Sequence, residues 1–215
     1  MRLRTGKTLD FRMFLARHDS REVRQFRRNE IIFSQGDRND SLFYIEKGAV
    51  KLTVSSDQGK EAVIGILDGG DFFGESCVVG QRVRSYTAVA LTDLCVARMK
   101  REDAVRVLQT NAAIAYSFIA RVLQNYARIQ EDLAENLLYS TERRLARALL
   151  LLTDLQDKGE LQPGVRVSQQ TLAEMVGTTR QRVNILMGRF RKQGLVRYGG
   201  GLKVRRSILN ASRKR

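Results

Sequence analysis

Short apolar segments alternate with polar turn clusters over residues 22–99. The segments EIIF, SLFYIE, AVKLTV, EAVIGIL, YTAVAL and LCVARM are rich in β-branched and aromatic residues, and clusters such as SQGD, EKG, SDQGK and LDGGD separate them. Strands that recur every 8–12 residues or so, with turn residues between them, are typical of an antiparallel barrel or sandwich. The region therefore predicts a compact antiparallel β domain.

Beyond Lys100 the apolar period changes from strand-like to helical. Apolar residues follow one another at steps of three or four with no Gly or Pro between them, and they are Ile114, Phe118, Val122, Tyr126, Ile129, Leu133 and Leu137. They predict one helix of roughly 25 residues, about 40 Å long. Because so long a helix exceeds what a small barrel covers, we expect the stripe to pair with the same helix of a second chain as a parallel coiled coil. Packing of the stripe within one chain is the alternative.

A second helix is predicted directly afterwards, ending before Thr153. Its apolar face consists of Leu145, Ala148, Leu149 and Leu152. The segment TDLQDKGELQPG that follows contains Gly159 and the only proline of the chain, Pro163. It predicts a surface loop.

The stretch TLAEMVGTTRQRVNILMGRF has the pattern of a helix–turn–helix. Ser168 is a plausible N-cap of a short first helix, and Gly177 ends that helix in the left-handed conformation that glycine adopts without strain. Thr178 or Thr179 then caps a second helix. The positions that pack the two helices together are small or apolar, and they are Ala173, Gly177, Val183 and Leu186.

Polar side chains gather at the starts of these two helices. Arg bonds guanine at two points in the major groove and Gln or Asn does the same for adenine. Downstream, GLVRYGGGLKVRR predicts a hairpin of strands Leu195–Tyr198 and Leu202–Arg205, a wing whose Lys203 contacts phosphates. The candidate DNA-binding residues are Ser168, Gln169, Gln170, Thr179, Arg180, Gln181, Arg182, Asn184 and Lys203. A polar helix face that is only solvated is the alternative.

The charge distribution supports a polyanion as partner. The chain has 38 Lys and Arg against 23 Asp and Glu, and residues 141–215 hold 17 of the former and 5 of the latter. A basic excess confined to one third of a chain is typical of a nucleic-acid-binding domain. A generally basic solvated surface is the alternative, and a membrane surface is disfavoured because no basic helix with an exposed aromatic face appears.

Other classes find little support in the composition. We expect a cytoplasmic protein, since no apolar run is long enough to cross a bilayer and the N-terminus lacks the apolar stretch of a secretory signal. Cys77 and Cys95 fit small core residues better than a redox pair. The single histidine, His18, cannot build a metal site. No Ser/His/Asp set and no GxxxxGK[ST] loop appears, so we expect no enzyme.

Taken together, the chain resembles the cyclic-AMP receptor protein (CRP/FNR) family of bacterial transcription regulators. The resemblance rests on NEIIFSQGDRNDSLFYIEKGAVKL, GDFFGES, VRSYTAVA and LAEMVGTTRQRVNILMGRFRKQGLV. It implies an α+β fold with an antiparallel β-roll over residues 1–110, a dimerisation helix over 111–139 and a winged helix–turn–helix over 140–215. It also implies a homodimeric regulator that binds double-stranded DNA at an inverted repeat, with RNA polymerase as a further partner.

The resemblance further implies a cyclic-nucleotide cassette in the roll. Its residues are Gly74, Glu75, Ser76, Arg84 and Ser85. Glu75 would accept from the ribose hydroxyl and Arg84 would grip the cyclic phosphate of cAMP or another cyclic nucleotide. Ile129 and Gln130 stand where cyclic-AMP-responsive members offer hydroxyl groups to adenine, so another small molecule, or no ligand, stays open.

Further alternatives concern the roll and the tail. One is an empty roll in which Glu75 and Arg84 form a buried ion pair. Another is a cyclic-nucleotide-binding signalling module that does not bind DNA. An iron–sulfur cluster, which other members of the family hold, needs about four cysteine thiolates, and the chain has two cysteines.

Overall fold

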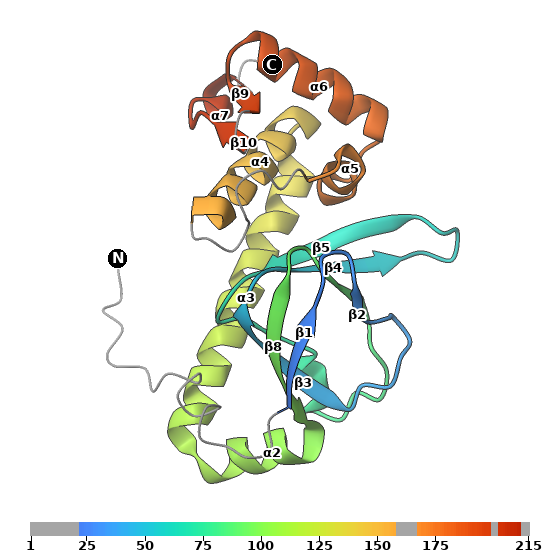
Figure 1. Ribbon diagram of the computed structural model, residues 1–215, viewed down its shortest axis with the longest axis vertical. Coiled ribbons are helices and arrows are strands. Elements are labelled where there is room, and N and C mark those ends of the chain that lie inside the picture. The colour runs from blue at the N-terminus through green and yellow to red at the C-terminus, as the bar shows by residue number, and fades with distance from the viewer. Residues whose placement is uncertain (1–21, 158–166, 199–201, 212–215) are drawn as a thin grey trace. The chain divides into compact units, whose positions relative to one another are not determined.

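The computed structural model describes residues 22–157, 167–198 and 202–211. It is an α+β fold, as expected, and Figure 1 traces its β-roll in blue to green and its C-terminal helices in yellow to red. The strands of the roll are β1 Glu22–Phe26, β2 Ile31–Phe33, β3 Ser41–Lys47, β4 Val50–Ser55, β5 Glu61–Leu67, β6 Phe72–Phe73, β7 Thr87–Ala90 and β8 Leu94–Lys100. The helices are the 3-10 turn η1 Glu75–Cys77, then α2 Arg101–Thr110, α3 Ala112–Leu138, α4 Thr141–Asp157, α5 Gln169–Val176, α6 Arg180–Lys192 and α7 Ile208–Ala211, and the hairpin β9 Val196–Tyr198 and β10 Leu202–Val204 lies between the last two.

The roll consists of two four-stranded sheets. One has the strand order β1-β8-β3-β6 and the other the order β2-β7-β4-β5. The pairs β1–β8, β3–β8, β3–β6 and β2–β7 are antiparallel. The apolar segments of the sequence thus form the antiparallel β domain that their spacing predicted.

Two apolar clusters hold the roll together. Aromatic rings fill one of them, where Phe43 stacks on Phe73 at 4.9 Å between centroids and both lie near Phe33. The other joins the outer side of a sheet to α2 and α3, and its buried residues are Leu42, Tyr44, Phe72, Cys77, Ala97, Met99, Ala104, Val107, Ile114 and Phe118. The helix α2, which the sequence analysis did not single out, therefore covers the roll.

The chain forms two compact units. One comprises the residues up to Val50 with Leu67–Arg128, and the other comprises Lys51–Ile66 with Ile129–Arg215. This division falls inside α3, whereas the expected domain limits at residues 110 and 139 lie at the end of α2 and one residue beyond the end of α3. Those domain limits stay a prediction.

The prediction that the whole apolar stripe of α3 faces a second chain is partly wrong. Ile114 is fully buried, Phe118 is 9% exposed and Val122 packs against the same cluster of their own chain. The reason is geometric, because each step of four residues advances a helix by about 400° and so drifts by about 40°. A stripe built from successive steps of four winds from the roll-facing side to the exposed side. Only its later members are exposed, namely Tyr126, Ile129, Leu133 and Leu137.

The helix α4 is longer than expected. The sequence predicted its end before Thr153, but it continues to Asp157. The Thr153 hydroxyl donates to the Leu149 carbonyl oxygen at 2.9 Å, so this threonine is accommodated inside the helix. The predicted apolar face is buried as expected, and the loop with Gly159 and Pro163 lies outside the described residues.

The helix–turn–helix and its wing are present. The helices α5 and α6 follow one another through Gly177, and β9 pairs antiparallel with β10, with Lys203 opposite Arg197. The triple-glycine turn of the wing lies outside the described residues. In the described part of the chain, no helix has both the length and the apolar character needed to cross a membrane.

Candidate functional site

Two side-chain caps fix the starts of α5 and α6. The Ser168 hydroxyl oxygen accepts from the Thr171 amide at 3.0 Å, and the Thr179 hydroxyl oxygen accepts from the Arg182 amide at 3.2 Å. Between the helices, Gly177 adopts φ 63° in the left-handed region and ends α5. Such caps satisfy amide groups that have no partner within the helix. The first turn of α6 is therefore well defined.

The inner face of the two helices is packed and the outer face is polar. The fully packed residues are Leu172, Ala173, Val176, Val183, Leu186, Met187 and Phe190. Arg180, Gln181, Arg182 and Asn184 are exposed, as predicted for side chains that reach a ligand outside the protein. Ile185 is also exposed, at 51%, and the sequence analysis did not select it. Its position four residues after Gln181 was the available signal, because residues four apart share a helix face.

Three of the predicted DNA-binding residues have hydrogen-bond partners within the chain. Gln169 Nε2 donates to Asn184 Oδ1 at 3.2 Å, which ties α5 to a predicted reading residue on α6. Gln170 Nε2 donates to Glu174 Oε1 at 3.1 Å. Together with the capping roles of Ser168 and Thr179, these bonds give the first turns of both helices a structural function.

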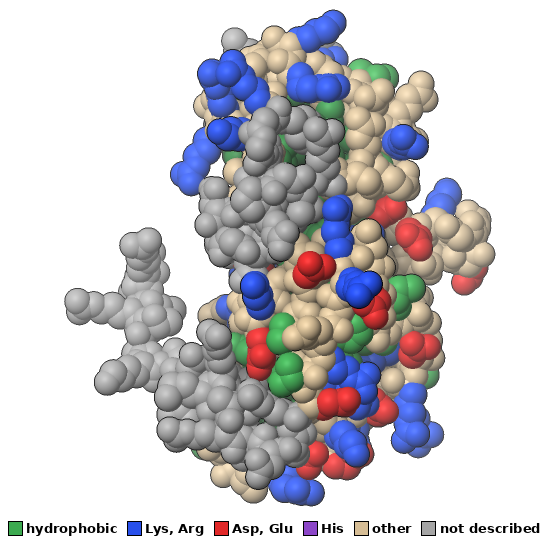
Figure 2. Space-filling model, viewed as in Figure 1, with side chains coloured by type: hydrophobic (Ala, Val, Ile, Leu, Met, Phe, Trp, Pro, Cys, Tyr) green, Lys and Arg blue, Asp and Glu red, His purple; other side chains and the backbone are tan. Residues whose placement is uncertain are grey.

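Basic side chains accompany this surface. Arg197 and Lys203 are opposite one another in the wing, and both are exposed, as are Arg205 and Arg206 directly after it. In the view of Figure 2, Lys and Arg side chains gather over the C-terminal elements, whereas Asp and Glu side chains alternate with them over the roll. The surface therefore presents positive charge to a polyanion.

In the roll, the predicted cassette surrounds η1. Arg84 is 4% exposed, and its Nη2 donates to the Ser41 carbonyl oxygen at 2.9 Å and to the Ser41 hydroxyl at 3.3 Å. Its Nη1 donates to the Gly74 carbonyl oxygen at 3.4 Å, and its guanidinium lies 4.1 Å from the centroid of the Phe33 ring. Burial lowers the pKa of Arg84. The alternative of a buried ion pair with Glu75 is wrong, because carbonyl oxygens and an aromatic face hold the guanidinium instead.

Glycine is the one residue type that fits at position 74. Its φ is 75°, and a Cβ there would collide with Arg84 Nη1 and with the Ser41 carbonyl oxygen. Its amide donates to the Tyr86 hydroxyl at 2.7 Å. The glycine thus allows the arginine to cross directly beneath the start of η1.

The other cassette residues differ in exposure. The Tyr86 hydroxyl donates to Glu75 Oε2 at 3.4 Å, and burial raises the pKa of both groups. The Ser76 hydroxyl accepts from Asn39 Nδ2 at 3.0 Å, and Ser85 is exposed. The structure therefore brings Gly74, Glu75, Ser76 and Arg84 together and leaves Ser85 at the surface.

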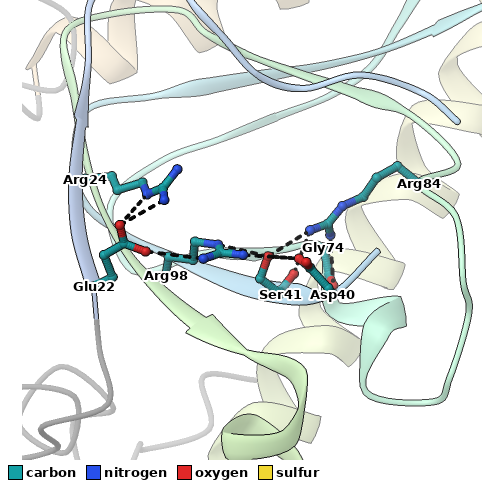
Figure 3. Close-up of polar contacts among 7 residues, drawn as sticks. All are labelled: Glu22, Arg24, Asp40, Ser41, Gly74, Arg84 and Arg98. Carbon is teal, nitrogen blue, oxygen red and sulfur yellow. Dashed lines mark hydrogen bonds and ion pairs between the residues drawn. The ribbon is translucent and has the colours of Figure 1, made fainter. Parts of the chain in front are cut away.

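A second arginine, which the sequence analysis missed, extends this network (Figure 3). Arg98 Nε donates to the Ser41 hydroxyl at 3.1 Å, and its terminal nitrogens pair with Asp40 and Glu22, each at 3.2 Å. The Ser41 hydroxyl donates to Asp40 Oδ1 at 2.7 Å and, together with Arg98, lowers the pKa of that carboxyl. Ser41 thus links Arg84 to the strands β1 and β8. No sequence pattern signals this, because the three strands meet only in the folded roll.

A buried carboxylate joins α3 to the end of the roll. Asp71 is fully buried, and its two oxygens pair with Arg121 Nε at 2.7 Å and with Arg128 Nη1 at 3.4 Å. Its Oδ2 also accepts from the Asp68 amide at 3.0 Å. Burial raises the pKa of Asp71 against the opposing effect of the two arginines.

Cys77 is buried and Cys95 is half-buried, neither forms a disulfide, and the Cys95 thiol donates to Glu46 Oε2 at 3.5 Å. Burial raises the pKa of the Cys77 thiol to about 11, which keeps it protonated. Within the described ranges, no three His, Cys, Asp or Glu side chains lie close enough together to hold a metal ion. His18 lies outside these ranges.

The β-roll, the long helix and the winged helix–turn–helix define the class of a two-domain transcription regulator. Residues 23–111 match the cyclic nucleotide-binding domain, and residues 143–210 match the Crp-like helix-turn-helix domain. The Cyclic AMP receptor protein of Thermus thermophilus is 30% identical over 179 residues, which cover 83% of this chain and 81% of that protein. The chain belongs to the cyclic AMP receptor protein family of transcription regulators.

Two further similarities agree with this membership. The cAMP-activated global transcriptional regulator Vfr of Pseudomonas aeruginosa is 27% identical over 187 residues, covering 84% of this chain and 87% of that protein. The solved structure of the c-di-GMP responsive global regulator CLP of Xanthomonas campestris has a TM-score of 0.74 at 22% identity, covering 91% of this chain and 97% of that one, and shows the shared fold. As a regulator of this family, the protein binds DNA through its helix–turn–helix and acts as a dimer under effector control. These relatives are regulators and not enzymes, and the alternative of a signalling module that does not bind DNA finds no support.

Proposed function

We propose that α6 of each protomer reads one half of an inverted-repeat operator. The observation that carries this proposal is the exposure of Arg180, Gln181 and Asn184 on a capped helix whose opposite face is buried. In this proposal Arg180 bonds a guanine and Gln181 or Asn184 bonds an adenine. The two reading helices enter successive major grooves about 34 Å apart.

The other candidate residues have supporting roles in this proposal. Arg182 and the wing residue Lys203 contact phosphates, and Gln169 orients Asn184 through the bond between their amides. Ser168, Gln170 and Thr179 hold the helix starts that face the duplex. Phosphate contacts of this kind set position and carry no sequence information.

Selection of binding sites from random duplexes, with the purified full chain, tests the reading proposal. We expect enrichment of an inverted repeat with a guanine at one fixed position of each half-site. Footprinting on the selected duplex should show protection of both half-sites. Enrichment of a single unrepeated sequence, or of none, would contradict the proposal.

The wing has a separate signature. The substitution Lys203→Ala should weaken binding to the cognate and the scrambled duplex by the same factor. It should also reduce the slope of log affinity against log salt concentration by about 1. Fluorescence anisotropy at several salt concentrations measures this slope. A selective loss for the cognate duplex would show that Lys203 reads bases.

We further propose that α3 forms the dimer seam along its exposed heptad positions. These are Tyr116, Ile119, Leu123, Tyr126, Leu133 and Leu137, which are 56–74% exposed and follow one another at steps of three, four or seven. The substitution Leu123→Glu should produce monomers in analytical ultracentrifugation, because it places charge in the seam. Leu138→Glu, the same change at an exposed leucine off this stripe, should leave a dimer. An unchanged dimer with Leu123→Glu would move the interface elsewhere.

For the effector, we propose a cyclic nucleotide, with cAMP as the first candidate, bound at the cassette around η1. The match to the cyclic nucleotide-binding domain and the cluster of Gly74, Glu75, Ser76 and Arg84 support this. A cyclic phosphate at this position would have to share Arg84 with the Ser41 and Gly74 carbonyl oxygens. The exposed Ser85 hydroxyl would add a donor.

A second candidate is a roll that binds no nucleotide. It is favoured by the bonds that already occupy Arg84 and the Gly74 amide within the chain. Calorimetry with cAMP and cGMP separates the two candidates. Heat that is reduced by Ser85→Ala, an exposed change that should leave the fold intact, supports the cassette. No heat from either nucleotide at millimolar concentration supports the second candidate.

RNA polymerase is a further proposed partner, and the cytoplasm is the proposed location. Both are supported by the class of the protein, because a bacterial transcription regulator acts where the chromosome is transcribed. Transcription in vitro from a promoter that carries the selected operator, with and without the protein, tests the first. A transcript level that does not respond would contradict it.

A further inference from the structure

Ile185 is an apolar side chain on the polar outer face of α6. Among the described residues from 167 to 211 it is the one large hydrophobic side chain that is well exposed, at 51%. Isolated exposed apolar residues are common on protein surfaces and need no function. The position of Ile185 is more informative than its exposure, because its neighbours on this face are the amide side chains of Gln181 and Asn184.

Gly188 lies one turn further along the same face. It is in the interior of α6, where glycine destabilises a helix relative to alanine. A Cβ at this position would meet nothing within 4 Å, so packing within the chain does not require a glycine. Its backbone conformation does not require one either, since its φ is not positive. Neither packing within the chain nor backbone conformation therefore accounts for the glycine.

Helix geometry places these residues together. At about 100° per residue, Gln181, Ile185 and Gly188 fall within about 60° of one another. The buried side chains of α6 occupy the opposite side, and they are Val183, Leu186, Met187 and Phe190. Asn184 flanks the outer strip, where Gln169 holds its amide. The strip thus combines amide groups, one aliphatic side chain and a bare stretch of backbone.

We propose that Ile185 is a specificity-determining residue that contacts the 5-methyl group of a thymine, and that Gly188 allows α6 to approach the floor of the groove. The methyl group of thymine is the apolar group that the major groove presents, and the amides of Gln181 and Asn184 suit adenine. The half-site therefore contains A·T pairs next to the guanine of Arg180. This inference rests on the proposed reading role of α6.

Removal of single methyl groups from the DNA tests the contact. In the selected operator, each thymine is replaced in turn by deoxyuridine, which lacks only the 5-methyl group, and affinities are measured by anisotropy. At one thymine position of each half-site, the replacement should lower the affinity of the wild-type protein about fourfold. This is the effect expected for burying one methyl group. Ile185→Ala should bind both duplexes equally, while Leu151→Ala, which shortens an exposed leucine on α4, should keep the wild-type difference.

Two outcomes overturn this assignment. One is a wild type that is indifferent to every replacement, and the other is an Ile185→Ala variant that still prefers thymine. Both leave the reading role of α6 intact, provided that the protein still selects its operator. A protein that selects no operator contradicts the proposed function itself, and therefore also the thymine contact that depends on it.

The role of Gly188 has a test with effects of opposite sign. Gly188→Ala should raise the melting temperature by about 2–4 °C, because alanine favours the helix and has room there. The same substitution should weaken binding to the operator by about tenfold or more, because the added methyl group holds the helix away from the bases. A variant that is more stable and binds the operator as tightly as wild type would show that nothing approaches Gly188 closely. A less stable variant would show that the glycine serves the fold.

Discussion

The reading helix and the effector cassette place their functional side chains in opposite environments. On α6, Arg180 and Gln181 are exposed and a packed helix face supports them from behind. In the cassette, Arg84 is 4% exposed and its two terminal nitrogens are already bonded to Gly74 and Ser41. Chemistry on an exposed face is independent of folding, whereas chemistry inside the roll shares its groups with the fold. Substitutions should therefore separate function from stability in the first region and combine them in the second.

The largest effect should come from Gly74→Ala. The added Cβ collides with Arg84 and the Ser41 carbonyl and must adopt a positive φ, so the free energy of unfolding should fall by about 2–4 kcal/mol. Gly59→Ala is the matched control, since Gly59 has φ 73° and open space around its Cβ position. It should cost about 1–2 kcal/mol. Equal losses in urea unfolding would show that the cassette is not packed around Gly74.

The next largest effect should come from Arg180→Ala, and it should appear in binding alone. The difference in binding free energy between the cognate and the scrambled duplex should fall by about 1–3 kcal/mol. Selection should be relaxed at one base position. Because Arg180 is exposed, the free energy of unfolding should stay within about 0.5 kcal/mol of wild type. An unchanged affinity ratio would mean that another residue reads that base.

Thr179→Ala should change both stability and operator binding, because this exposed residue caps α6. Loss of its cap should cost about 1 kcal/mol of stability and also weaken operator binding by loosening the first turn of α6. Thr179→Ser keeps the hydroxyl and should retain both properties. Thr178→Ala should be neutral, since the Thr178 side chain is not the cap. Thermal melts and anisotropy on the three variants decide this.

The smallest effect should be the pH dependence that Glu75 gives to the roll. Its folded pKa is raised above the ordinary 4.5, so the native state holds more protons than the unfolded state in the interval above that value. Stability therefore falls as pH rises through this interval, and Glu75→Gln should remove that fall. Relative to wild type, the variant should gain stability as the pH rises above about 4.5. Glu61→Gln, at an exposed carboxyl on β5, serves as control, and parallel pH profiles of wild type and Glu75→Gln would contradict the burial of this group.

The sequence predicted the exposed region more fully than the buried one. The cap at Ser168, the left-handed Gly177 and the inward Val183 and Leu186 are local patterns, and the structure confirms each of them. The partners of Arg84 and Arg98 are not local, because β1, β3, β8 and η1 meet only in the folded roll. The sequence therefore indicated which residue types gather at the cassette but not which atoms they bond.

The same limit explains the two errors in the helices. Apolar spacing on α3 does not say which face a roll will cover, and only the packing of Ile114 and Phe118 decides it. On α4, Gly159 and Pro163 predicted a loop in the segment that begins at Thr153, but these two residues do not fix where before them the helix ends. In both cases the sequence pattern was compatible with two answers.

The carboxylate of Asp71 sets a boundary for motion in this protein. Sliding the N-terminal part of α3 away from the roll would strip a fully buried anion of its bonds to Arg121 and Arg128, and an uncompensated buried charge costs several kcal/mol. These two ion pairs therefore hold α3 against the roll as far as Arg128. A rearrangement that keeps these two ion pairs would have to bend the chain beyond Arg128.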